Sequence, residues 1–163
     1  LGNNQQIIRT IPNTPASIKK GVTAIYFNRN CKNKTIKESI LLMQAVGETI
    51  IVDDENLMDA YTAVSGSGPA YIFYFVEAII SAAKEMGINE KNARILAEKT
   101  LIGSAYLLEN TQARAQDLRK AVTSPKGTTE AGLNVLMKKD AFFNLTSRAI
   151  QKAQKRGREL GKS

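Results

Sequence analysis

The 163-residue sequence contains no histidine, no tryptophan and only one cysteine, Cys31. The absence of histidine excludes Ser-His and Cys-His catalysis, histidine metal sites and acid–base chemistry by an imidazole. A single cysteine forms no intrachain disulfide, which suits a reducing cytosol, and we interpret Cys31 as an inert thiol because it has no histidine partner. No carboxylates have metal-ligand spacing, so the sequence predicts no metal site.

A dinucleotide-binding fingerprint is also missing, because no G-x-G-x-x-G occurs in the sequence. The only G-x-G, Gly66-Ser67-Gly68, precedes Pro69 and does not complete that motif. The chain begins with Leu1 rather than methionine, close to a predicted strand. We interpret it as a C-terminal portion, and cloning, proteolysis or a split gene would each explain the missing part.

Long hydrophobic runs are scarce, and the longest, residues 70–83, contains Glu77. We expect this run to be too short to span a bilayer, and no signal peptide is visible, so we predict a cytoplasmic protein without a membrane partner. The net charge is +8. A basic C-terminus can indicate nucleic-acid binding, a solvated helix face or a field that attracts an anionic substrate and cofactor. No aromatic residue lies between the charges to stack on a base, so we expect no nucleic-acid partner.

The first 54 residues have the pattern of an α/β piece. Short β-branched runs at 7–11, 22–27 and 49–52 predict strands, and residues 35–46 have helical spacing that ends at Gly47. The resulting β-β-α-β order is too small for an independent sheet, because it leaves edges and a face uncovered. We therefore predict an incomplete domain over residues 1–54.

Residues 55–163 are predicted to be helical throughout, so the fold class is mainly α. We expect a helix capped by Asp53 or Asp54 that stops at Ser65–Gly68, followed by a helix from Pro69 to Met86. Further helices are expected after Asn89 and at about 128–138 and 141–160. The helix after Pro69 is apolar on almost every side and needs cover all round, which favours a homodimer over tight packing by the last two helices.

Residues 122–133, VTSPKGTTEAGL, are the most informative segment. Ser124–Gly127 predicts a loop, and Thr128 begins a helix whose first N–H groups point outward. Such a helix start can bind a carboxylate or phosphate, and the hydroxyls of the segment lie beside it. The alternative is an ordinary capped helix after a turn.

Three segments together resemble the pyrroline-5-carboxylate reductase family: VTSPKGTTEAGL, RTIPNTPASIKKGVTAIYF (9–27) and DAYTAVSGSGPAYIFYFVEAI (59–79). The resemblance implies that residues 1–54 complete a Rossmann-type nucleotide-binding domain, and that 55–163 form an all-α domain for dimerisation and substrate binding. It implies NADPH or NADH as cofactor, with most of that site in the missing half. Lys126 stands where the family has glycine, so we expect this loop to hold it at negative φ or with strain.

The activity implied by the resemblance is hydride reduction of the cyclic imine 1-pyrroline-5-carboxylate to L-proline, the last step of proline biosynthesis. It assigns substrate binding to Ser124, Gly127, Thr128 and Thr129. Gly127 and Thr128 would present N–H groups to the carboxylate, and Thr129 would act catalytically as the donor at the ring nitrogen. Asn13 would contact the cofactor near the nicotinamide. The structural alternatives are helix capping by Thr128 and Thr129, a turn at Ser124 and an Asx turn at Asn13.

Two other functions remain open at this stage. The first is a non-catalytic homo-oligomerisation module derived from the enzyme, and the second is a basic nucleic-acid binder. We expect this portion alone to be inactive. The sequence does not distinguish NADPH from NADH or set the oligomer beyond a dimer.

Overall fold

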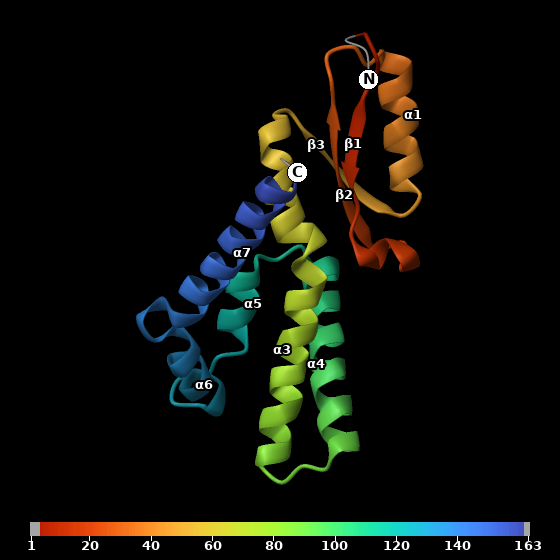
Figure 1. Cartoon of the computed structure of the whole chain (residues 1–163). Helices are drawn as coiled ribbons and strands as arrows, with labels where there is room; N and C mark the ends of the chain where they lie inside the picture. The colour runs from red at the N-terminus through yellow and green to blue at the C-terminus, as the bar shows by residue number, and fades with distance from the viewer. Residues whose placement is uncertain (1–3, 162–163) are drawn as a thin grey trace. The chain divides into compact units, whose positions relative to one another are not determined.

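The computed structural model describes residues 4–161, and these fall into two compact units (Figure 1). Among these residues, the first unit contains 4–71 and 147–161, and the second contains 72–146. One three-stranded sheet is followed by helices, which confirms the predicted fold class. The start of the long helical region and the end of the last helix group with the sheet, so the domain boundary at residue 54 stays a prediction.

The sheet of the first unit has the predicted β-β-α-β order. Strands β1 (Ile8–Ile11), β2 (Gly21–Phe27) and β3 (Gly47–Val52) lie in the order β1-β2-β3. The pair β1–β2 is antiparallel and the pair β2–β3 is parallel. Parallel strands need a crossover, and helix α1 (Asn33–Gln44) supplies it.

Alternating side chains of β2 are buried on both faces of this sheet. Ala24 belongs to a buried cluster with Val52 and Met58, the first residue of α2 (Met58–Tyr61). Thr23 and Ile25 point to the other face and are also buried. The strand is therefore the centre of the first unit, and it fixes where the chain enters its long helical region.

The turn between α1 and β3 requires glycine. Gly47 has φ +146°, and a Cβ placed on it would overlap the carbonyl of Gly21 on the paired strand. Only a residue without a side chain fits this close approach. The glycine that the sequence marks as a helix end is thus also the first residue of β3.

The predicted stop at Ser65–Gly68 is wrong, because helical backbone continues through it. A short 3₁₀ helix (η2, Glu55–Leu57), α2, a π-helical segment (η3, Thr62–Gly66) and α3 (Gly68–Glu85) follow one another. The Ser67 N–H donates to the carbonyl of Thr62, five residues back, at 2.9 Å. The wide π turn accommodates Pro69, whose ring would clash with a regular helical turn and which has no N–H to donate.

The continuous helix also corrects the membrane argument. Residues Glu55–Glu85 form a helix that is long and apolar enough to cross a membrane by length and composition. The apolar run at 70–83 is part of this longer helix, so its own length does not decide the question, and the absence of a membrane partner stays a prediction. Length and composition alone are weak evidence for a membrane span, since the core helix of a soluble protein passes the same test.

The second unit is built on a helical hairpin. Helix α3 is followed by a turn in which Gly87 has φ +88°. Asn89 caps α4 (Glu90–Thr111) by accepting a hydrogen bond from the Asn92 N–H at 2.9 Å, as predicted. Buried alanines at 83, 93 and 97 line the two helices. Helices α6 (Thr128–Met137) and α7 (Ala141–Leu160) match the expected ranges, with the short 3₁₀ helix η4 (Lys138–Asp140) between them. Helix α5 (Ala115–Ala121) was not predicted separately.

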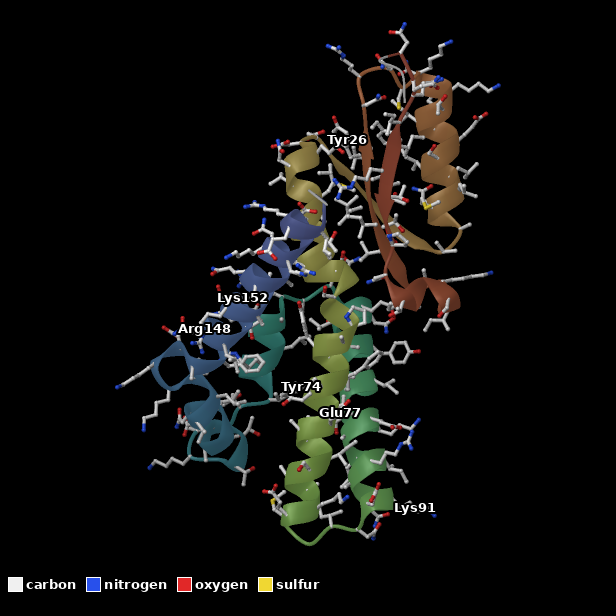
Figure 2. All side chains as sticks on the ribbon, viewed as in Figure 1. Tyr26, Tyr74, Glu77, Lys91, Arg148 and Lys152 are labelled. Carbon is white, nitrogen blue, oxygen red and sulfur yellow. The ribbon has the colours of Figure 1, made fainter. Side chains whose placement is uncertain are left out.

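Large apolar side chains of α3 and α4 are exposed in the single chain. Phe142 of α7 packs on Phe75 with ring centroids 6.1 Å apart, so the last helices do contact α3. They leave Tyr74 73% exposed and Phe73 60% exposed. Figure 2 labels Tyr74 on α3. Further exposed apolar residues on these two helices are Ile72, Ile95, Leu96, Ile102, Tyr106, Leu107 and Leu108. So much apolar surface is typical of an interaction face.

Candidate functional site

The segment between α5 and α6 forms a tight turn. The Gly127 N–H donates to the Ser124 carbonyl at 3.0 Å, which closes a four-residue β-turn with Pro125 and Lys126 in its centre. Lys126 has φ +59°. Type II turns need positive φ at this third position and favour glycine there. Of the two expectations for Lys126, the strained one is therefore confirmed.

A carboxylate from the first turn of α6 reaches back to the turn that precedes the helix. Gly127 is the N-cap residue and offers no side chain, and the Glu130 Oε2 accepts a hydrogen bond from the Lys126 N–H at 2.8 Å. This reach back over the first turn resembles half of a capping box. It accounts for Glu130 as a structural residue, as the sequence suggested.

Only some of the N–H groups that the sequence predicts to point outward at this helix start are free to bind an anion. The expectation of an outward N–H at Gly127 is wrong, because that group closes the turn on Ser124. Within residues 4–161, the N–H groups of Thr128 and Thr129 donate to no other residue. Free N–H groups in the first turn of a helix attract anions. The anion-binding character of the segment therefore rests on these two threonines.

Three hydroxyls lie beside these N–H groups. Ser124, Thr128 and Thr129 are exposed, and among the described residues none of their hydroxyls makes a hydrogen bond. Helix α6 has no side-chain cap, so neither threonine serves as the cap that the alternative interpretation required. By contrast, the neighbouring Thr123 hydroxyl donates to the Arg119 carbonyl at 2.6 Å. The turn thus presents three free hydroxyls and two free N–H groups in six residues.

Asn13 lies in the first unit, whereas the turn lies in the second. Its Oδ1 accepts a hydrogen bond from the Val22 N–H at 3.0 Å, and its carbonyl accepts one from the Ala16 N–H at 3.0 Å. It does not form the Asx turn considered from the sequence, because its side chain reaches the start of β2. The next residue, Thr14, begins a 3₁₀ helix (η1, Thr14–Ile18) with proline in its first turn.

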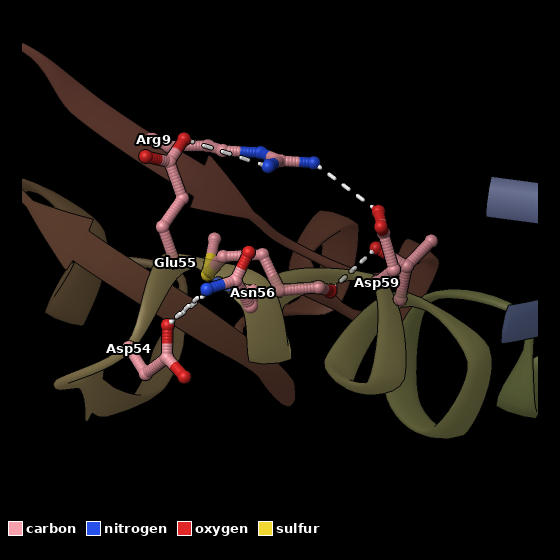
Figure 3. A network of polar contacts seen from close by, with 7 residues as sticks. Arg9, Asp54, Glu55, Asn56 and Asp59 are labelled. Atoms are coloured by element: carbon pink, nitrogen blue, oxygen red, sulfur yellow. Dashed lines mark hydrogen bonds and ion pairs between the residues drawn. The ribbon is translucent and has the colours of Figure 1, made fainter. Parts of the chain in front are cut away.

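A polar network that the sequence did not reveal joins β1 to the start of the helical region (Figure 3). Arg9 lies 3.3 Å from the Asp59 Oδ1 and 3.6 Å from the Glu55 Oε1. Asp54 caps the adjoining 3₁₀ helix through the Asn56 N–H at 2.9 Å. These residues border an open hollow of about 820 Å³ in the first unit. Arg9 and Asp59 are 50 positions apart, so no local signal pairs them.

Comparisons with known proteins place these features in one family. The family model for pyrroline-5-carboxylate reductase dimerisation matches residues 55–160. Pyrroline-5-carboxylate reductase from Pseudomonas aeruginosa is 36% identical over 160 residues, covering 98% of this chain and 58% of that protein. The enzyme from Synechocystis is 40% identical over 156 residues, covering 96% and 58%.

Solved structures give the same result. A pyrroline-5-carboxylate reductase from Coxiella burnetii matches with a TM-score of 0.91 and 37% identity, covering 98% of this chain and 59% of that one. Plasmodium falciparum pyrroline carboxylate reductase with NADP bound matches with a TM-score of 0.87 and 28% identity, covering 98% and 60%. The chain therefore belongs to the pyrroline-5-carboxylate reductase family. It spans about three-fifths of the length of these relatives.

Proposed function

We propose that this chain supplies the substrate loop and the subunit interface of a pyrroline-5-carboxylate reductase. The reaction is reduction of the cyclic imine 1-pyrroline-5-carboxylate to L-proline, the last step of proline biosynthesis, with NADPH or NADH as hydride donor. The observation that carries the proposal is the turn at residues 124–129. Within the described residues, the free hydroxyls and N–H groups of this turn make no hydrogen bond that stabilises the fold. In a chain of this family they are therefore available to a substrate.

The substrate carboxylate is assigned to the start of α6. The N–H groups of Thr128 and Thr129 donate to its oxygens, and the positive end of the helix dipole adds attraction. Ser124 donates its hydroxyl to the same carboxylate from the other side of the turn. The net charge of +8 draws a small anion to the protein. Gly127 contributes the tight backbone on which these donors are arranged.

The ring nitrogen of the imine is assigned to the Thr129 hydroxyl. The nicotinamide coenzyme, when bound, supplies the hydride that reaches the imine carbon. The nitrogen then takes a proton, and the Thr129 hydroxyl donates a hydrogen bond to it or relays a proton from water, since a threonine hydroxyl is a weak acid. Correct placement of the imine is the main contribution of this chain to the rate.

Asn13 is assigned to the nicotinamide end of the coenzyme. Its Oδ1 is held by the Val22 N–H, which fixes the side chain and leaves the amide N–H groups to donate. The rest of the coenzyme site belongs to parts of the enzyme outside this chain. The chain therefore does not decide between NADPH and NADH.

The exposed apolar faces of α3 and α4 are assigned to a homodimer interface. The match to a dimerisation model covers both helices and supports this assignment. A second copy would cover Phe73 and Tyr74, which the rest of the chain leaves in water. We place the assembled enzyme in the cytoplasm, without nucleic-acid or membrane partners.

The test is turnover by this chain joined to the nucleotide-binding half of a family member. We expect imine-dependent oxidation of NADPH or NADH, which the 163 residues alone do not catalyse. Thr129→Ala should lower kcat by about 100-fold, and Thr129→Ser should restore much of it. Thr123→Ala is the matched control, because its hydroxyl binds the Arg119 carbonyl, and it should leave kcat unchanged.

The second candidate function is a non-catalytic oligomerisation module, favoured by the exposed apolar faces and by the strained Lys126. It predicts a dimer that shows no imine-dependent turnover even when joined to a functional nucleotide-binding half. That result would replace the reductase proposal.

A further inference from the structure

Two side chains of opposite charge line one apolar hollow of the second unit without pairing with each other. Glu77 of α3 and Arg94 of α4 border a hollow of about 540 Å³, together with Phe73, Val76 and Ile80. Within residues 4–161, Glu77 makes no hydrogen bond or ion pair. Figure 2 shows Glu77 near the middle of α3.

Arg94 keeps most of its donors. Its Nε donates to the Glu98 Oε1 at 2.7 Å, and this hydrogen bond and the charge of Glu98 raise the pKa of Arg94, so that the guanidinium stays charged. A guanidinium has five N–H groups, and no further acceptor is found for them in the described part of the chain.

A second copy that covers this face would remove the Glu77 carboxylate from solvent. Its neighbours one helical turn away are Phe73 and Ile80, so covering this apolar face takes the carboxylate out of water. A buried carboxylate without a partner is strongly destabilising. Glu90 and Glu98 also line the hollow, but Glu90 pairs with the Lys84 ammonium at 3.0 Å and Glu98 with Arg94, so that among the described residues Glu77 is the carboxylate of the hollow left without a cation. The covering surface must bring a cation.

In a twofold interface the partner subunit contributes the same residues, and this identifies the cation that faces Glu77. In such an interface the same patch faces itself, so that if residue i contacts residue j, then j contacts i. Among the residues that line the hollow, Arg94 is the basic one. We propose that Glu77 of each subunit pairs with the partner subunit's Arg94, which gives two identical ion pairs across the interface. This inference rests on the proposed dimer.

The pair gives the interface specificity as well as affinity. An apolar face would bind many apolar surfaces, whereas an unpaired buried carboxylate penalises any partner that lacks a cation at this place. The partner selected is thus a second copy of this chain.

Charge reversal in the 163-residue chain tests the pair. Glu77→Arg and Arg94→Glu should each raise the dimer Kd by at least about 30-fold, measured by sedimentation equilibrium. An equimolar mixture of the two variants should recover dimers, since each introduced charge then meets its opposite across the interface. Native mass spectrometry should show that these recovered dimers contain one copy of each variant.

Matched controls reverse charges elsewhere. Lys99→Glu, on the far side of α4 from Arg94, and Glu38→Arg on α1 should leave the dimer Kd unchanged. Glu77→Leu should weaken the dimer, because it removes the carboxylate that the partner subunit's Arg94 meets across the interface and leaves that guanidinium with Glu98 alone. A tighter dimer with leucine would show that Glu77 is unpaired and would overturn the proposal. Far-UV circular dichroism checks that each variant is folded.

Three results would overturn the inference. The first is that either reversal alone associates as the wild type does. The second is that the mixture stays monomeric while a chain carrying both reversals dimerises, which would make the pair intrachain. The third is that the wild-type chain is monomeric. The last result removes the proposed dimer as well. The first two, obtained with a wild-type dimer, remove only the ion pair.

Discussion

Lys126→Gly should stabilise the protein. Lys126 holds φ +59° at the third position of its turn, where an L-residue costs roughly 1–2 kcal/mol relative to glycine. The greater freedom of glycine in the unfolded chain returns about 0.5–1 kcal/mol of this. The hydrogen bond from the residue 126 N–H to Glu130 is kept. We therefore expect a net gain of about 0.5–1 kcal/mol, which corresponds to a rise in Tm of about 1–4 °C.

Thermal unfolding followed by circular dichroism measures this gain, with protein concentration held constant because association shifts Tm. Lys126→Ala keeps the unfavourable φ and removes only the ammonium, so it should not raise Tm. Lys19→Gly is a second test, since Lys19 also has φ +59°, and it should raise Tm similarly. A fall in Tm for Lys126→Gly would refute the reasoning and show that the lysine side chain stabilises the turn.

Three further substitutions test the fold and the start of α6. Gly47→Ala should cost at least about 3 kcal/mol in urea unfolding, because its Cβ would overlap the Gly21 carbonyl at positive φ. Met58→Ala should cost about 2–5 kcal/mol in the same assay, since Met58 is fully buried against the sheet. Glu130→Ala should cost about 1 kcal/mol in thermal unfolding by removing the acceptor for the Lys126 N–H.

Local signals in the sequence predicted most of the secondary structure. Gly87 and Asn89 mark the turn of the helical hairpin because positive φ and an N-cap are properties of single residues. The continuous helix through Ser65–Gly68 was missed for the opposite reason. Glycine and proline normally end a helix, and only the π turn before Pro69 allows it to continue.

The substrate and cofactor roles of the candidate residues stay predictions, and the structure bears only on their local geometry. In the part of the chain that the structure describes, the N–H groups of Thr128 and Thr129 are free, as an anion-binding helix start requires. The direction of the Gly127 N–H depends on the turn that Lys126 adopts, which residue preferences alone do not fix. Contacts between distant residues, such as Arg9 with Asp59, depend on how β1 packs on the helical region and leave no local pattern in the sequence.

The measurement that tests the central claim most directly is an amide NMR titration of the 163-residue chain with L-proline. The account predicts that the amide signals of Thr128 and Thr129 shift as the proline carboxylate binds their N–H groups. Pyrrolidine, which has the ring but no carboxylate, should leave both signals in place. Amide signals of Thr128 and Thr129 that stay fixed in saturating proline would contradict the account.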